Sequence, residues 1–330
     1  MAAGTVFWNP RQHRVRAGWR ILVHGAGFWI LLLVFEDLRH AAAGAGLLGS
    51  RISGSPVRLV VDELTVLVTY GLLIATLLLA ARYLDHRTPA GTGFHIDRRW
   101  WTDLGFGLVL GAVLMALIFM TELALGWVTV SGHLATATPG LPFWLAVLVP
   151  LIVYVAVGVG EELWSRGYVL VNLTEGLHGS RVGPTAAIVA ATLIQAVVFA
   201  LLHAGTPGAS AASAGVEVVL GLLFAAGVLL TGDLAIPIGL HISWNFCEGN
   251  VFGFAVNGSM SSTGGFLVTR QGGPVAWTGG SYGPEAGLLA VSAAVVGVLA
   301  ILAFVGTHRE HRPGLPRWPE SRAGADRVSR

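Results

Sequence analysis

The chain has 330 residues, of which 54% are hydrophobic and only 12% are charged. A soluble domain carries about twice that share of charged residues, because its surface must face water. The composition therefore excludes a soluble fold and predicts a polytopic membrane protein. The formal net charge is +2, and most arginines flank hydrophobic segments, which favours membrane topology over nucleic-acid binding. The single cysteine, Cys247, excludes an internal disulfide and a Cys-based metal site.

Eight apolar stretches are long enough to cross a bilayer, which takes about 20 helical residues. The sequence therefore predicts an all-α fold, a polytopic transmembrane helix bundle of about eight spans. The stretches lie near residues 18–36, 60–82, 104–130, 142–174, 184–204, 215–232, 234–252 and 284–306. The fourth would be about 50 Å long as one helix, so it must tilt, break or project beyond the lipid.

Arginine-rich segments predict the orientation of the bundle. They lie in the N-terminal tail 1–17, near 82–99 and in the C-terminal tail 307–330, and the segment 131–141 is uncharged. By the positive-inside rule we expect both termini on the cytoplasmic side. The C-terminal tail is rich in Arg, Pro and Glu and is expected to be disordered. The Gly-rich segment 253–283 predicts a loop, either ordered over the bundle or mobile.

Three hydrophobic segments carry notable side chains four residues apart, a spacing that places both members of a pair on one helix face. Ionisable groups inside a bilayer cost several kcal/mol each, so they line a cavity or pair with one another. We expect these segments to point their pairs into the bundle interior. The pairs are Glu162 and Arg166, directly after Glu161; Phe199 and His203; and His241 and Asn245.

The spacing suggests a division of roles between the consecutive glutamates. Glu162 precedes Arg166 by four residues, the favourable order for an ion pair. Glu161 lies about 100° away around the helix and is left to face a cavity, where a carboxylate can take a proton from water. His203 could hold the same water, and His241 with Asn245 could donate to an oxyanion on a peptide carbonyl. Packing explains any one pair equally well, but not three pairs together.

Other polar residues in the apolar stretches are less informative. Glu122, Gln195, Glu217 and Glu248 could line a cavity, but hydrogen bonding between helices is the better expectation.

The ordered set of pairs resembles the CPBP family of intramembrane proteases, which includes CAAX-processing and bacteriocin-processing enzymes. The family pattern is EExxxR, then FxxxH, then HxxxN or HxxxD, and this chain matches it at every position. The resemblance covers about residues 100–250, inside an expected transmembrane domain 18–306. Residues 245–254 and 278–285 resemble a bacterial subgroup, so we expect an integral protein of a bacterial cytoplasmic membrane.

The resemblance implies an endopeptidase that hydrolyses a peptide bond near the bilayer. Glu161 and His203 would activate water, and His241 and Asn245 would form the oxyanion site. Glu162, Arg166 and Phe199 would support this geometry. The implied partners are a membrane-associated peptide or protein substrate and the lipid bilayer; the sequence does not indicate an oligomeric state.

The sequence leaves the cofactor and two other functions open. HExxH is absent, so we expect water activation without a required cofactor, while a divalent ion such as zinc is not excluded because Glu, His and Asn can bind it. One alternative function is a non-proteolytic scaffold or immunity protein on the same fold. The other is a proton-coupled transporter, which the lack of a convincing internal repeat disfavours.

Overall fold

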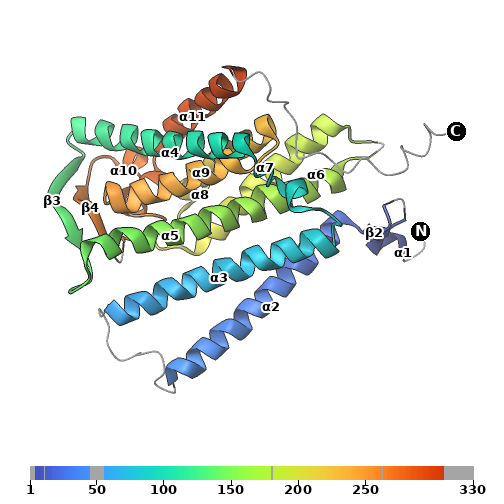
Figure 1. Cartoon of the computed structure of the whole chain (residues 1–330). Helices are drawn as coiled ribbons and strands as arrows, with labels where there is room; N and C mark the ends of the chain where they lie inside the picture. The colour runs from blue at the N-terminus through green and yellow to red at the C-terminus, as the bar shows by residue number, and fades with distance from the viewer. Residues whose placement is uncertain (1–3, 11, 45–55, 180, 262, 308–330) are drawn as a thin grey trace.

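The computed structural model describes residues 4–10, 12–44, 56–179, 181–261 and 263–307, which form a mostly helical bundle (Figure 1). Within these residues, seven helices are long and apolar enough to cross a bilayer, which confirms the predicted class of polytopic helical bundle. The helices of the seven spans are α2 (Ala17–Gly44), α3 (Pro56–Tyr83), α4 (Arg98–Ala124), α5 (Phe143–Glu162) together with α6 (Val171–Leu177) as one span, α7 (Pro184–Leu202), α8 (Ala211–Thr231) and α11 (Leu288–Thr307). The C-terminal tail expected to be disordered falls on 308–330, outside the described residues.

The segment 234–252, expected as the seventh of the eight spans, forms a shorter helix at the centre of the bundle. It comprises α9 (Ala235–Phe246) and a π-helical turn, η4 (Cys247–Val251). Every residue from 235 to 245 is buried. Figure 1 shows α9 running between α4 and α5, both of which it contacts. Protein rather than lipid therefore surrounds this apolar stretch.

Glycines allow the backbones of α9 and α4 to contact each other. A Cβ added to Gly239 of α9 would overlap the carbonyl oxygen of Leu104, and one added to Gly111 of α4 would overlap that of Leu240. Such close packing is typical of helix pairs inside membranes. It fixes the depth and rotation of α9, which carries His241 and Asn245.

The long fourth stretch continues through a change of helix type. It runs from Phe143 to Leu177 as α5, the π-helix η2 (Leu163–Leu170) and α6. The change begins directly after Glu162, and π-helical turns inside α-helices are frequent at functional sites. The stretch stays one continuous helical span of 35 residues, so the expectation that it tilts or projects beyond the lipid stays a prediction.

An antiparallel two-stranded sheet at one end of the bundle adds a feature that the all-helical prediction lacked. Strand β3 (Val128–Thr136) pairs with β4 (Gly264–Gln271), with a register shift between Val130 and Gly132. After β4 come three short helices: α10 (Val275–Thr278), η5 (Gly280–Tyr282) and η6 (Pro284–Ala286). Within the described residues, the Gly-rich segment is thus an ordered cover and not an extended loop.

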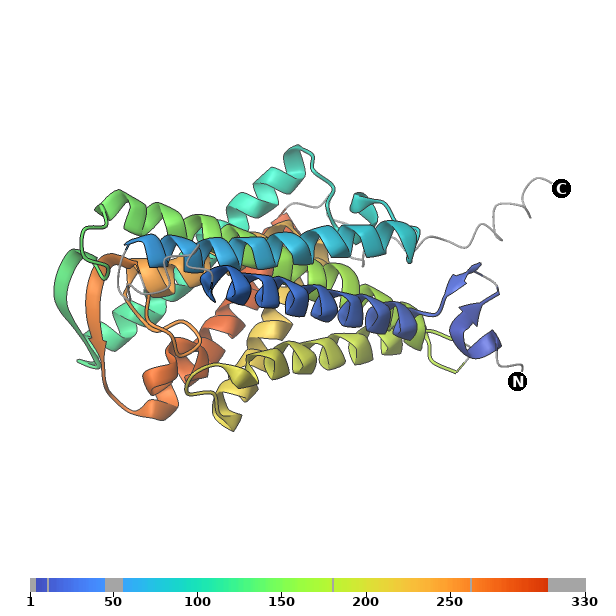
Figure 2. The ribbon, with the colours of Figure 1, turned by 90° about the horizontal axis from the view of Figure 1, so that it is seen from below.

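The opposite end of the bundle carries the folded N-terminus (Figure 1). Helix α1 (Gly4–Phe7) leads into strands β1 (Trp8–Asn9) and β2 (Arg14–Val15), which pair antiparallel. The short helix η1 (Pro89–Thr92) lies between α3 and α4 in the chain. Helices α2 and α3 contact each other; in Figure 1 they meet near the N-terminal strands and diverge toward their other ends, and Figure 2 views the same pair from below. Only 6% of the most apolar window of α2 is buried, as expected of a helix that faces lipid.

Candidate active site

The two consecutive glutamates lie at the junction of α5 and η2 and have different surroundings. The Glu162 side chain is fully buried, and its Oε1 accepts hydrogen bonds from Arg166 Nη1 and from His241 Nδ1, both at 2.9 Å. The Glu161 side chain is 20% exposed. Its Oε1 accepts a hydrogen bond from the Tyr70 hydroxyl at 2.5 Å, and its Oε2 lies 3.8 Å from His241 Nε2. The Glu162 carboxylate is therefore fixed by its two partners, whereas the Glu161 carboxylate remains partly accessible to solvent.

Arg166 joins three helical segments around the site. Besides Glu162, it donates through Nη2 to the carbonyl oxygen of Gly221 on α8, at 3.1 Å. Its guanidinium carbon lies 4.5 Å from the ring centroid of Phe199 and 5.1 Å from that of Phe224. A buried guanidinium needs such acceptors and aromatic faces because it has left water. Phe199 thus packs against the cation that neutralises Glu162.

His203 is the C-cap residue of α7 and begins the short helix η3 (His203–Gly205). Its Nδ1 lies 2.9 Å from the backbone carbonyl oxygen of Phe199. A carbonyl oxygen can only accept, so Nδ1 carries the proton of this hydrogen bond. In a neutral imidazole, Nε2 is then an acceptor. This is the form that can hold a water molecule by one of its protons.

His241 and Asn245 lie one turn apart on α9. The His241 ring stacks on Phe224, with centroids 5.0 Å apart, and faces Glu162 through Nδ1 and Glu161 through Nε2. Both side chains are nearly buried, at 5% exposure. The rigid packing of α9 against α4 fixes their positions.

Four of the predicted site residues line one cavity of about 500 Å³. They are Glu161, His203, His241 and Asn245, and Phe199 also contributes to the wall. The other walls come from α2, α3, η2 and the segment after η4. Residues that complete the lining include His24, Phe28, Trp29, Thr69, Tyr70, Tyr154, Trp164 and Asn257. Glu162 and Arg166 lie behind the wall, buried and bonded to each other.

A second, smaller cavity of about 250 Å³ meets the first at His203. Its lining includes polar side chains from α8 and its N-terminus, Ser210, Ser213 and Glu217, and Tyr282 of η5. His203 belongs to the walls of both cavities. His203 is thus the residue at which a cavity with several aromatic side chains adjoins one lined by serines and Glu217.

A cluster of buried carboxyl groups anchors the Gly-rich cover to α9. Trp244 Nε1 donates to Glu285 Oε1 and the backbone N–H of Asn257 donates to Glu285 Oε2, both at 3.2 Å. The Tyr282 hydroxyl lies 2.8 Å from the Asn257 side chain and 3.4 Å from Glu217 Oε1. Burial, and then the nearby Glu217, raise the pKa of Glu285 to about 8. Glu285 is therefore mostly protonated at neutral pH.

Gln195, one of the side chains expected to form interhelical hydrogen bonds, does so, since its Nε2 donates to Ser165 Oγ of η2 at 2.5 Å. Glu122 bonds instead to a strand, because Gln271 Nε2 of β4 donates to Glu122 Oε2 at 2.9 Å. Within the described ranges, no three His, Cys, Asp or Glu side chains are grouped to hold a metal ion.

Sequence reasoning missed Tyr70 and the partners in the C-terminal cover. Tyr70 is a single tyrosine in an apolar stretch, and its separation from Glu161 along the chain matches no helical spacing that would predict a contact. Tyr282 and Glu285 lie in the segment 278–285, which resembles a bacterial subgroup. That resemblance did not indicate what either side chain does.

The fold and the cavity together define a polytopic membrane protein with a polar site enclosed by its helices. Residues 142–247 match a protein-family model described as Type II CAAX prenyl endopeptidase Rce1-like. The chain therefore carries an Rce1-like domain of the CPBP family, which confirms the resemblance seen in the three pairs and implies intramembrane proteolysis. No curated protein and no solved structure matches the chain.

Proposed function

We propose that this protein is an intramembrane endopeptidase that hydrolyses a peptide bond of a membrane-associated substrate by direct attack of water. One observation carries the proposal: Glu161, His203, His241 and Asn245, from three separate segments, line a single cavity of about 500 Å³. Its largely aromatic wall suits a hydrophobic peptide, and the four side chains supply the polar chemistry.

In the proposed mechanism, water lies between Glu161 and His203. His203 Nε2 accepts a hydrogen bond from the water, since Nδ1 donates to the Phe199 carbonyl oxygen. Glu161 Oε2 takes the other hydrogen of the water as a proton while the water oxygen attacks the peptide carbonyl carbon, because Oε1 is occupied by Tyr70. Glu161 then delivers that proton to the leaving amine. The more polar cavity beside His203 gives water a route to the site.

The tetrahedral intermediate carries negative charge on the former carbonyl oxygen. The Asn245 amide and His241 Nε2 are placed in the cavity wall to donate to this oxygen. Donation by Nε2 requires a proton on both ring nitrogens, since Nδ1 faces the Glu162 carboxylate. Two neighbouring glutamates favour that imidazolium form. Glu162, Arg166 and Phe199 act by positioning His241 and the η2 turn.

The test uses the full chain in liposomes, incubated with a pool of membrane-protein substrates, and reads new N-termini by mass spectrometry. Glu161→Gln keeps the shape of the side chain and removes the base, so cleavage should fall by about 100-fold or more. Glu122→Gln is the matched control, since Glu122 is also buried in a span but does not line the cavity. His203→Ala should lose cleavage as well.

Three results would reject the proposal. Cleavage that persists unchanged in Glu161→Gln would remove the proposed base. Proton-coupled uptake by the wild type that is lost in the same variants, without any cleavage, would favour a transporter. A wild type that binds a peptide and never cleaves it would favour a scaffold.

A further inference from the structure

A cavity larger than that of the candidate active site lies away from it, at the end of the bundle that carries the N-terminal hairpin. It has a volume of about 700 Å³. Its walls come from β1 and β2, the first turn of α2, the end of α6 and the start of α7. The active-site residues described above are not part of its lining.

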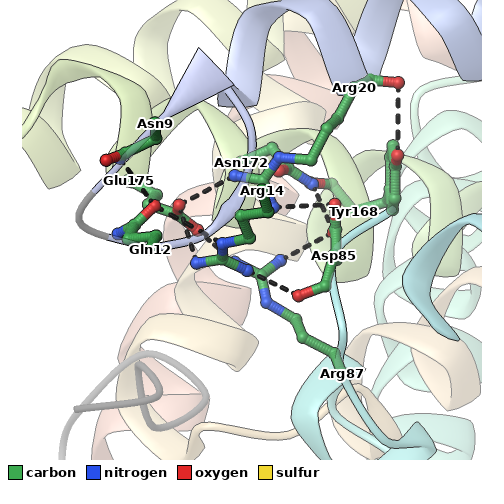
Figure 3. Close-up of polar contacts among 9 residues, drawn as sticks. All are labelled: Asn9, Gln12, Arg14, Arg20, Asp85, Arg87, Tyr168, Asn172 and Glu175. Carbon is green, nitrogen blue, oxygen red and sulfur yellow. Dashed lines mark hydrogen bonds and ion pairs between the residues drawn. The ribbon is translucent and has the colours of Figure 1, made fainter. Parts of the chain in front are cut away.

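Beside this cavity lies a buried network with more positive than negative side chains, shown in Figure 3. Arg14 and Arg20 both donate to Glu175 Oε1 at 2.8 Å, and Arg87 donates to Glu175 Oε2 at 2.7 Å. Arg20 and Arg87 also donate to Asp85, at 2.8 and 3.1 Å. Three arginines therefore share two carboxylates. Counted over the residues that the structure describes, the network carries one positive charge in excess, and a buried unbalanced charge is costly.

The excess charge is accessible from the cavity through Arg14. This side chain lines the cavity and donates to the Asp85 carbonyl oxygen, Glu175 and Gln12. A guanidinium has five N–H bonds, so two remain for a ligand in the cavity. Glu175 also lines the cavity, but its two oxygens already accept from three arginines. Its charge is neutralised and does not repel an anion.

Further groups in the lining favour an anion with an apolar attachment. Arg16 is exposed and belongs to the wall, and so do Ala17 and Gly18 at the start of α2. The first N–H groups of a helix have no acceptor within the helix and attract phosphate. Trp19 and Leu22 line the same cavity and are 36% and 60% exposed, on the helix that faces lipid.

We propose that this cavity binds a phosphate-bearing anion, and that the anion is the headgroup of an anionic phospholipid. Arg14 and Arg16 contact the phosphate, which balances the excess charge of the network. Trp19 and Leu22 contact the glycerol and the first part of the acyl chains. A bound lipid would join the N-terminal hairpin to α2 and α6 without taking part in catalysis.

The test is a thermal-shift titration of the purified full chain in detergent. The probes are short-chain phosphatidylglycerol, short-chain phosphatidylcholine and inorganic phosphate. Arg16→Gln removes one cation from the wall at an exposed position, and the Tm without any added probe checks that the variant is folded. Arg82→Gln is the matched control, since Arg82 is exposed near the same network but does not line the cavity. We expect phosphatidylglycerol to raise the Tm in a saturable way, with an apparent affinity about tenfold weaker in Arg16→Gln.

The three probes distinguish a lipid headgroup from free phosphate as the bound anion. Saturation by phosphatidylglycerol well below the concentration needed with inorganic phosphate supports a lipid headgroup. An equal response to inorganic phosphate, weakened in Arg16→Gln alone, overturns the lipid in favour of a soluble phosphate. The site itself is refuted if Arg16→Gln titrates like the wild type, if Arg82→Gln is weakened equally, or if phosphatidylcholine acts as well as phosphatidylglycerol. None of these readouts depends on proteolysis.

Discussion

Replacing Tyr70 by Phe tests whether the proposed base depends on a hydrogen bond from outside the family-matched segment. The Tyr70 hydroxyl donates to Glu161 Oε1 at 2.5 Å, and this contact leaves Oε2 to face His241 Nε2. A hydrogen bond to a charged group contributes about 1.5–3 kcal/mol. Phe keeps the ring and its packing, so the variant removes the hydroxyl alone. Without it, Glu161 can rotate away from the reacting water.

We expect kcat to fall about tenfold in Tyr70→Phe, the equivalent of about 1.4 kcal/mol in the activation barrier. The KM should stay nearly constant, because the hydroxyl faces the carboxylate and not the peptide. The assay is cleavage of a substrate peptide by the full chain in liposomes, with thermal unfolding as a check of folding. Tyr83→Phe is the control, since Tyr83 lies on the same helix and is 70% exposed.

Two outcomes would refute this reasoning about Tyr70. The first is an unchanged kcat, which would show that Glu161 needs no such support. The second is a further large loss when Tyr70→Phe is added to Glu161→Gln, because a residue that acts through the Glu161 carboxylate has little left to position once the base is gone.

Two further predictions concern stability, measured by thermal unfolding in detergent. Gly239→Ala should destabilise the protein by about 1–3 kcal/mol, since the new methyl group would overlap the Leu104 carbonyl oxygen; Gly27→Ala, where a Cβ meets no atom within 4 Å, should not. Equal Tm values for these two variants would contradict the close packing of α9. Burial raises the pKa of Glu285 from its ordinary value of 4.5 to about 8, so its contribution to stability is complete below about pH 4.5 and is lost as the pH rises through 8. Glu285→Gln should flatten this decline in Tm, and a decline as steep as in the wild type would show that other groups cause it.

Hydropathy predicted the spans well because lipid contact requires long apolar helices. Hydropathy predicted eight spans, because it cannot distinguish an apolar stretch that faces lipid from one that is surrounded by protein. In α9 every residue from 235 to 245 is buried, so its composition is as apolar as that of a span. The distinguishing feature is the backbone contact at Gly239, which depends on α4 more than 100 residues earlier in the chain. The pairing of β3 with β4 was missed for the same reason, since each strand needs a distant partner.

Helical spacing predicted the local part of the candidate site. The Glu162–Arg166 ion pair follows from a separation of four residues, and the structure contains it at 2.9 Å. The contact of His241 with Glu162 joins residues far apart in the chain, and the sequence assigned His241 only to the oxyanion. Tyr70 was not anticipated, because an apolar stretch with one tyrosine indicates no partner.

The one-residue offset between Glu161 and Glu162 gives the site both rigidity and access. Glu162 Oε1 binds Arg166 and His241 at once, and Arg166 also reaches the Gly221 carbonyl oxygen, so this carboxylate ties α5 and η2 to α9 and α8. A buried charge with two charge-assisted partners cannot leave its place without losing both, and it is poorly suited to exchange protons with water. These contacts also fix the backbone of the neighbouring residue, Glu161. The Glu161 side chain itself lines the cavity. The EExxxR pattern thus separates the group that holds the helices from the group that can act on water.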